Sequence, residues 1–223
     1  MKKTRIILLI VSVFTGSISL NAQQLPLYSQ YMFNTLEINP AYAGFKQSIQ
    51  FTSIFRKQLN GMKDSPQTAL ISGDMPIGQT KLGVGLKIID DRISVSKTFG
   101  AQASLSYKIE GDNSNLAFGL QVGALDYKAD FSKLTLTDPG DPAFQQDLNT
   151  MTANIGTGIF YNTRKFYAGF STPNLVRSHL REASITTSEY DVKQQAHLYL
   201  NAGYLITLND NFTLKPSFLL RGV

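Results

Sequence analysis

The sequence predicts an all-β protein, an antiparallel transmembrane β-barrel, and three observations support this fold class. Beyond residue 47, apolar and polar residues alternate with a period of two, which is typical of strands whose two faces meet different surroundings. Short connections rich in turn residues alternate with longer ones, as in barrels with short turns at one end and long loops at the other. The polar faces carry Gly, Ser, Thr, Gln and Asn rather than Lys and Glu, which suits a crowded barrel interior.

The overall composition excludes two other classes of protein. Hydrophobic residues make up 43% of the chain and aromatic residues 11%, which is not the composition of a disordered chain. Charged residues make up only 17%, below the roughly 25% of an average soluble domain. The apolar run from Ile6 to Leu20 is shorter than the roughly 20 residues that a spanning helix needs. A polytopic helical membrane protein is therefore excluded.

Residues 1–22 are predicted to be a secretory signal peptide. They contain a basic start that includes Arg5, an apolar stretch from Ile6 to Phe14, and the small residue Ala22 before a cleavage site. The alternative for these residues is a buried N-terminal helix. Cleavage would leave 18 basic and 16 acidic residues, a balance that gives no support for a nucleic-acid partner. The chain has no Cys, so disulfides, thiolate metal sites and a lipid-modified N-terminal Cys are excluded.

Residues 23–47 follow neither the period of a strand nor that of a helix. The segment is rich in aromatic and Asn residues, and Asn39-Pro40 and Ala43-Gly44 are turn signals. A segment this aromatic is expected to pack against other parts of a protein. We interpret it as an N-terminal periplasmic segment that plugs the barrel mouth or docks a partner there. The alternative is a first strand preceded by coil.

Residues 48–223 are predicted to form the barrel, with nine strands and no amphipathic helix. The clearest alternation runs from Thr98 to Ile109, where Phe99, Leu105 and their neighbours at period two share one face. Pro216 lies inside the last run and indicates an edge or a bulge there. The nine ranges are Ser48–Lys57, Gln67–Met75, Lys81–Ile89, Thr98–Ile109, Asn115–Leu125, Thr150–Tyr161, Lys165–Phe170, Gln195–Thr207 and Phe212–Leu220.

The connections predict the topology. Four are short and rich in turn residues: Pro76–Thr80, Glu110–Ser114, Asn162–Arg164 and Leu208–Asn211. Three are long: Gln58–Pro66, Asp126–Asn149 and Ser171–Gln194. One, Asp90–Val95, is of medium length. If the short turns are periplasmic, the first and ninth strands both run outward. Because single-chain bacterial barrels have even strand numbers, we expect a partial barrel that is truncated at the C-terminus, or else a small complete barrel with one strand miscounted.

A soluble two-sheet sandwich is the alternative to a barrel, because its strands alternate in the same way. Aromatic residues near predicted strand ends favour the barrel, since they suit an interfacial girdle: Tyr107, Tyr161, Phe166, Tyr167 and Tyr204. The absence of Trp weighs mildly against a girdle.

No motif in the sequence predicts a catalytic, cofactor or metal site. The two histidines, His179 and His197, stand in no recognisable arrangement with a nucleophile and an orienting group, and their spacing does not support a metal site. The pairs Gly83/Gly85 and Gly156/Gly158 are not phosphate loops, because the strand pattern continues through them and no helix follows. We interpret such glycines as relieving crowding on the barrel wall.

The segment Tyr28–Asn34, followed by Asn39–Gly44, resembles the N-terminal signature of the PorP/SprF family, outer-membrane proteins of the type IX secretion and gliding machinery. Further similarity lies in Arg56-x-Gln58-x-x-Gly61, Pro66-x-Thr68, Gly83-x-Gly85 with Asp90-Asp91, Leu116-x-Phe118-Gly119, Asp141–Phe144, Tyr167–Ser171 and Gly203-Tyr204. Two positions depart from the family pattern. Thr35 stands where Pro is common, and Leu59 stands where an aromatic residue is common.

The resemblance implies a non-enzymatic barrel without a cofactor, located in the outer membrane of a Gram-negative bacterium and in contact with its lipid. Such a barrel helps to export cargo proteins or to hold them at the surface. The implied partners are the periplasmic ring, other type IX components, and cargo or adhesins with C-terminal sorting domains. Candidate docking residues are Tyr28, Gln30, Tyr31, Phe33, Asn34, Asn39, Pro40 and Tyr42. The alternatives are a passive porin or small-solute transporter, and a soluble periplasmic β-sandwich binding module.

Overall fold

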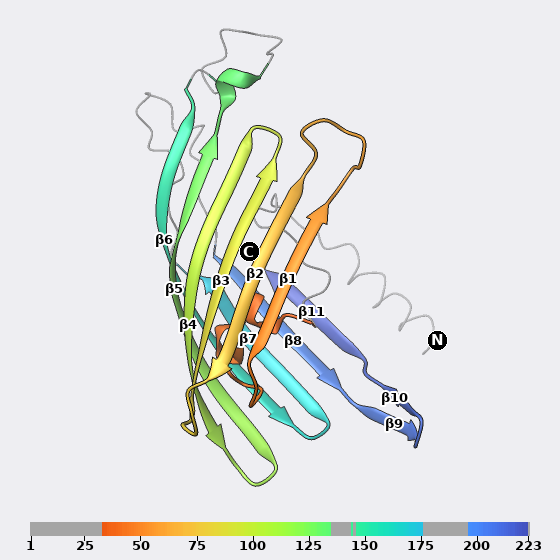
Figure 1. The fold of residues 1–223 in the computed structure, drawn as a ribbon. Coiled ribbons are helices and arrows are strands. Elements are labelled where there is room, and N and C mark those ends of the chain that lie inside the picture. Colours follow the sequence, from red (N-terminus) through yellow and green to blue (C-terminus); the bar gives the residue numbers. More distant parts are fainter. Residues whose placement is uncertain (1–32, 135–143, 145, 176–195, 223) are drawn as a thin grey trace, which may run out of the picture.

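The computed structural model describes residues 33–134, 144, 146–175 and 196–222, and in this part the chain is all-β. Nine antiparallel strands form one curved sheet, a half-barrel, in the order β1-β2-β3-β4-β5-β6-β7-β8-β11 (Figure 1). The predicted fold class is thereby confirmed. The predicted signal peptide lies outside the described residues. Among the described helices, none has the length and apolar character needed to cross a membrane.

The strands match the predicted runs in order and are mostly longer. In the main sheet they are β1 (Gln50–Lys57), β2 (Gln67–Pro76), β3 (Leu82–Ile93), β4 (Ser96–Glu110), β5 (Ser114–Ala129), β6 (Leu148–Thr163), β7 (Phe166–Asn174), β8 (His197–Tyr204) and β11 (Ser217–Gly222). A separate hairpin pairs β9 (Ile206–Asn209) with β10 (Phe212–Leu214). Three short 3₁₀ helices complete the described elements: η1 (Thr35–Glu37), η2 (Pro40–Tyr42) and η3 (Phe131–Lys133).

The short turns β2–β3, β4–β5 and β6–β7 lie at one end of the half-barrel, the lower end in Figure 1, and the longer β1–β2 and β5–β6 connections lie at the other, together with the turn between β3 and β4. One connection differs from the prediction. Instead of ending at Ile89, β3 continues to Ile93, and a two-residue turn at Ser94 and Val95 leads into β4. The sequence predicts a connection at Asp90–Val95, but the charged residues around Asp90 keep the strand register. As expected, β1 and β11 run in the same direction.

The last two predicted runs are interrupted. The run Gln195–Thr207 yields β8 and the first half of β9, and the run Phe212–Leu220 yields β10 and the start of β11. Pro216 lies between β10 and β11, where its missing N–H breaks no strand ladder, and its carbonyl accepts a hydrogen bond from the Tyr204 N–H at 3.0 Å. The edge or bulge indicated by Pro216 in the sequence is therefore a break between strands.

The two faces of the sheet have opposite character. The outward side chains of β4 are apolar and exposed, and the larger of them are each 44–48% exposed: Phe99, Leu105, Tyr107 and Ile109. Its inward positions are small or polar and are buried: Gly100, Gln102, Ser104 and Ser106. A soluble sandwich buries its apolar faces against each other. The sandwich alternative therefore does not describe this fold.

The outward apolar side chains form a continuous surface, which we call the outer apolar belt. One row of directly opposed residues crosses seven strands: Leu82, Tyr107, Phe118, Ile159, Phe170, Leu200 and Leu220. On β4 the outward positions stay uncharged from Phe99 to Ile109. These ten steps of about 3.3 Å, tilted by about 40°, give a height of roughly 25 Å, the height of the apolar band of a transmembrane barrel.

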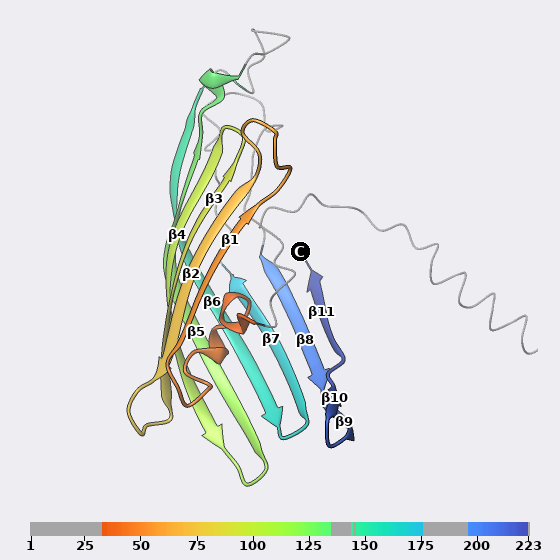
Figure 2. The ribbon, with the colours of Figure 1, turned by 45° about the vertical axis from the view of Figure 1, so that its right-hand side comes forward.

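The concave side holds the residues that precede β1. We call residues 34–45 the inner segment. Its helices η1 and η2 lie within the curve of the sheet, toward the end with the short turns (Figure 2). The inner segment is therefore the structural feature that distinguishes this half-barrel from a bare curved sheet.

Candidate functional site

The inner segment crosses the concave face and contacts seven consecutive strands, β2 to β8. The contacts, in strand order, are Asn34 to Ser72, Glu37 to Lys87, Ala43 to Ser106, Ala41 to Ala117, Asn39 to Ile159, Ile38 to Ser171, and Ile38 to Tyr199. A segment without strand periodicity thus touches nearly the whole sheet. Its sequence pattern is irregular because its successive residues meet different strands, some through side chains and some through backbone carbonyls.

Asn39 is fully buried at the centre of these contacts. Its Oδ1 accepts a hydrogen bond from the Ala41 N–H at 2.9 Å, which caps η2, and Pro40 takes the first helical position. Its Nδ2 donates to the Ile159 carbonyl on β6, also at 2.9 Å. The Asn39-Pro40 turn signal therefore starts the short helix and fixes it to the wall.

Glycines on the wall allow the inner segment to approach closely. A Cβ added at Gly83, Gly119 or Gly158 would lie 2.1 Å from an atom of the inner segment. No side chain larger than hydrogen fits at that distance. Such glycines are predicted from the sequence to relieve crowding on the wall, and in the structure they make room for the inner segment.

Wall side chains satisfy the backbone of the inner segment. The Ser171 hydroxyl donates to the Ile38 carbonyl at 2.6 Å, and the Ser106 hydroxyl donates to the Ala43 carbonyl at 2.5 Å. The Gly44 N–H donates to the Asp74 carboxylate at 2.8 Å. Because buried backbone groups must find partners, these bonds let a short, non-repetitive segment be buried without a sheet ladder of its own.

An ion pair joins η1 to β3. The Lys87 ammonium lies 3.5 Å from the Glu37 carboxylate and also donates to the Glu37 carbonyl at 3.2 Å. Both side chains are nearly buried, at 7% and 11% exposed. Burial raises the pKa of Glu37 above 4.5, and the nearby Lys87 opposes this rise. Removal of either partner would leave the other buried without its counter-charge.

An aromatic anchor holds the inner segment at the short-turn end. Its members are Tyr42, Phe45, Phe160 and Tyr167, with ring centroids 4.9–6.0 Å apart along the cluster. The Lys108 ammonium lies 5.9 Å from the Phe45 ring centroid. Burial raises the pKa of Tyr42 to about 12, helped by the negative charge of Asp74. The phenol of Tyr42 therefore stays neutral in the physiological pH range.

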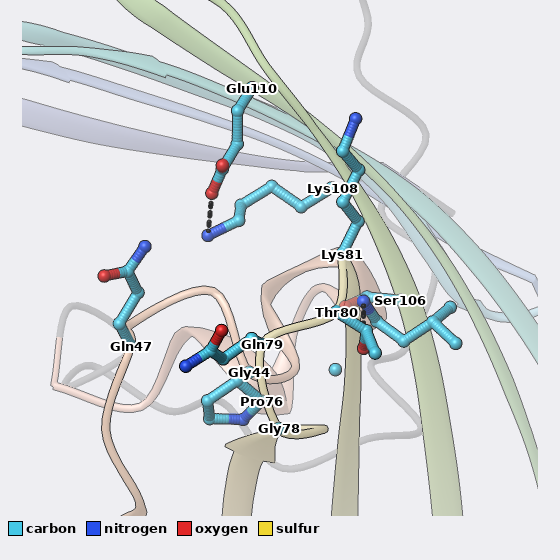
Figure 3. A pocket seen from close by; sticks show the side chains of 12 residues that line it. Gly44, Gln47, Pro76, Gly78, Gln79, Thr80, Lys81, Ser106, Lys108 and Glu110 are labelled. Carbon is cyan, nitrogen blue, oxygen red and sulfur yellow. Dashed lines mark hydrogen bonds and ion pairs between the residues drawn. The ribbon is translucent and has the colours of Figure 1, made fainter.

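A pocket of about 410 Å³ opens beside the point where the inner segment leaves toward β1 (Figure 3). It is lined by Gly44, Gln47, Pro76, Gly78, Gln79, Thr80, Lys81, Leu82, Gly83, Ser106, Lys108 and Glu110. The Lys108 ammonium pairs with the Glu110 carboxylate at 2.7 Å. Within the described ranges, no group of three or more His, Asp or Glu side chains could hold a metal ion.

The structure brings several predicted site residues together on the concave face. Asn34, Asn39 and Pro40 are buried against the wall, and Tyr42 belongs to the aromatic anchor. Phe33 precedes them and is 75% exposed. Three of the predicted residues lie outside the described part of the chain: Tyr28, Gln30 and Tyr31.

The wall partners of the inner segment could not be predicted from the sequence. Lys87, Ser106 and Ser171 stand 50 to 133 positions from the residues they bind, so no local pattern links them. The period-two glycines were the one local signal of a close approach. His197 is fully buried on the concave face, and His179 lies outside the described residues.

Comparison with known proteins gives a family match that covers most of the chain. The model of the family described as type IX secretion system membrane protein PorP/SprF matches residues 20–223. The matched range includes the inner segment and every strand of the half-barrel. No curated protein and no solved structure matches the chain.

Proposed function

The chain belongs to the PorP/SprF family of type IX secretion system membrane proteins, and on this premise we propose that it is an outer-membrane component of that machinery. In this role it supports the export or surface attachment of cargo proteins such as adhesins, without catalysis or a cofactor. The observation that supports a membrane location is the distribution of side chains, apolar and exposed outside, polar and buried inside. Transmembrane barrels show the same distribution.

The proposed orientation places the short-turn end in the periplasm, because transmembrane barrels have short periplasmic turns and longer external loops. Residues 1–22 then act as the signal peptide that directs the chain across the inner membrane. The inner segment, the aromatic anchor and the pocket all lie toward the periplasmic end. The periplasmic ring, other type IX components and cargo with C-terminal sorting domains would meet the barrel from this side.

Within this role, we propose that the inner segment plugs the barrel rather than leaving an open lumen. The observation that carries the proposal is its contact with seven strands across the concave face. The side chains of Asn34, Asn39 and Pro40 are buried against the wall, so they contribute to plugging more directly than to docking. Phe33, at the start of the segment, is exposed and is the described side chain best placed to dock a partner.

Deletion of residues 24–44 tests the proposal in cells. We expect cargo secretion to stop while the barrel remains inserted in the outer membrane, as measured by fractionation and by cargo in the medium. Normal secretion by this variant would refute the role of the segment. The Phe33→Ala variant is the matched test of docking, since it removes an exposed side chain without touching the wall. Loss of secretion at normal protein level would support docking through Phe33.

A passive porin is the competing function, and electrical measurements separate the two. A plugged barrel should show no steady conductance in planar bilayers, whereas the deletion variant should conduct. Steady conductance by the unaltered protein would favour the porin and refute the plug. Co-purification of ring components from membranes would test the secretion role independently of the plug.

A further inference from the structure

Beyond the outer apolar belt, the sheet carries a row of basic residues on its outward face. Directly opposed residues on six neighbouring strands form this basic row: Lys57, Gln67, Arg92, Lys97, Lys128 and Asn149. Four of the six are cationic and none is acidic. Directly opposed residues of an antiparallel sheet point to the same face, so the four cations lie side by side along one edge of the belt.

The row lies at the long-loop edge of the outer apolar belt. On β4, Lys97 follows the last outward apolar residue, Phe99, by two positions toward the long-loop end. The next row toward the belt, level with Phe99, contains Asp90 and Asp126, and below that row the outward side chains of the described strands are uncharged. A membrane that covers the belt would therefore end at the row, where phosphate groups replace acyl chains.

The acidic side chains near the basic row are too few to neutralise its four positive charges. Arg92, Lys97 and Lys128 face one another on adjacent strands, and such like-charge neighbours destabilise a sheet. Asp90 and Asp126, one step closer to the belt, pair with them: Asp90 with Arg92 at 2.7 Å and with Lys97 at 3.8 Å, and Asp126 with Lys128 at 3.1 Å. Together with Lys57, four cations thus meet two carboxylates in these two rows.

We propose that the basic row binds the phosphate groups of anionic lipid headgroups in the leaflet at the long-loop end. Six strands at about 4.8 Å spacing give the row a length of roughly 24 Å, enough for several headgroups. Guanidinium and ammonium groups form charge-assisted hydrogen bonds with phosphate, and their mutual repulsion is relieved when anions lie between them. The inference requires the apolar belt to face lipid, and it is independent of the plug and of the secretion partners.

Native mass spectrometry of the detergent-solubilised full chain tests the proposal. The protein is titrated with phosphatidylglycerol and, separately, with phosphatidylcholine. We expect phosphatidylglycerol to be retained preferentially and to be lost as ionic strength rises. The single variant Lys57→Gln should weaken retention by up to about fivefold, the effect of one cation at a membrane surface, and the quadruple variant K57Q/R92Q/K97Q/K128Q should weaken it much more.

A matched control uses basic residues at the opposite end of the barrel, K81Q/K165Q/K215Q, and should retain phosphatidylglycerol like the parent. Far-UV circular dichroism checks that each variant is folded, and Lys57→Gln decides the question if the quadruple variant unfolds. Equal retention of the two lipids by the parent would overturn the proposal. So would an equal loss in the row and control variants, or displacement of the lipid by inorganic phosphate at the same concentration.

Discussion

At the scale of the residue, the inner segment can approach the wall only where the wall residue is glycine. We expect Gly119→Ala to displace η2, because the added Cβ would lie 2.1 Å from the Ala41 backbone nitrogen. Overpacking of this kind costs about 1–3 kcal/mol, and backbone atoms cannot rotate away. The urea midpoint of the folded protein, followed by circular dichroism, measures the loss.

The matched control for that substitution is Gly73→Ala, also within a strand. Its Cβ would find its nearest atom, the Gln50 carbonyl oxygen, at 3.4 Å, an ordinary contact. The free energy of unfolding of this variant should stay within the few tenths of a kcal/mol expected for a substitution away from special features, so its urea midpoint should match that of the parent. Equal losses at Gly119 and Gly73 would mean that the effect comes from strand propensity and not from the inner segment.

The buried pair of Glu37 and Lys87 makes stability depend on pH. Because burial raises the pKa of Glu37, the folded state holds a proton there more tightly than the unfolded state does. Stability should therefore fall as pH rises from about 4.5 through the raised pKa. Lys87→Met removes the opposing cation, so the pKa of Glu37 should rise further and the fall should extend to higher pH, with a loss of about 3–5 kcal/mol where Glu37 is ionised.

Urea midpoints measured from pH 4.5 to pH 8 test this expectation. The double variant Glu37→Gln/Lys87→Met supplies the control, because it has no carboxylate at this position and should lose the added pH dependence. An unchanged pH profile in Lys87→Met would show that the ion pair does not govern the titration of Glu37.

At the scale of the element, the aromatic anchor should fasten the end of the inner segment. Phe45 stacks on Tyr42 at 5.6 Å and meets the Phe160 edge at 4.9 Å between centroids. We expect Phe45→Ala to lose about 2 kcal/mol from these two aromatic contacts and the lost apolar area, and to expose the segment to protease. Limited proteolysis of the folded protein measures this exposure. Phe51→Ala removes an outward-facing ring from β1 and should leave the digestion rate unchanged.

The strands could be predicted from the sequence because their information is local. Alternation along β4 and β5 follows from one face meeting the interior and the other the exterior. The prediction ended β3 too early because Asp90 and Arg92 resemble loop residues. Asp90 lies at the edge of the apolar belt and Arg92 lies beyond it, where a strand can continue into polar surroundings. Strand length in this protein is therefore set by pairing, whereas the apolar pattern marks only the middle of each strand.

The site could be predicted only in part, for a physical reason. Aromatic composition indicated that residues 23–47 pack on something, but periodicity cannot reveal a segment whose partners lie on seven strands. Glu37 received no attention in the sequence because its partner, Lys87, is 50 positions away. The partners of such a segment follow from the curvature of the whole sheet, which no local pattern encodes.

At the scale of the whole molecule, a membrane location requires that lipid covers the outer apolar belt. Leu120 lies in the belt on β5, points outward and is 62% exposed. In lipid, Leu120→Arg should cost about 2–4 kcal/mol, because a charge on the lipid face of a barrel is most unfavourable near the midplane. In water the same exposed substitution would change stability by at most about 0.5 kcal/mol.

The control for Leu120→Arg is the same substitution at a position nearer the membrane surface. Met151 also points outward and is 75% exposed, but it lies in the row of Asp90 and Asp126 at the edge of the belt. Met151→Arg should therefore cost only about 0–1 kcal/mol. Both variants are folded into lipid vesicles and titrated with urea, with the folded fraction read from heat-dependent gel mobility. Equal effects at the two positions would contradict a lipid-covered belt, because only a membrane makes the energy of a surface charge depend on its height along the barrel.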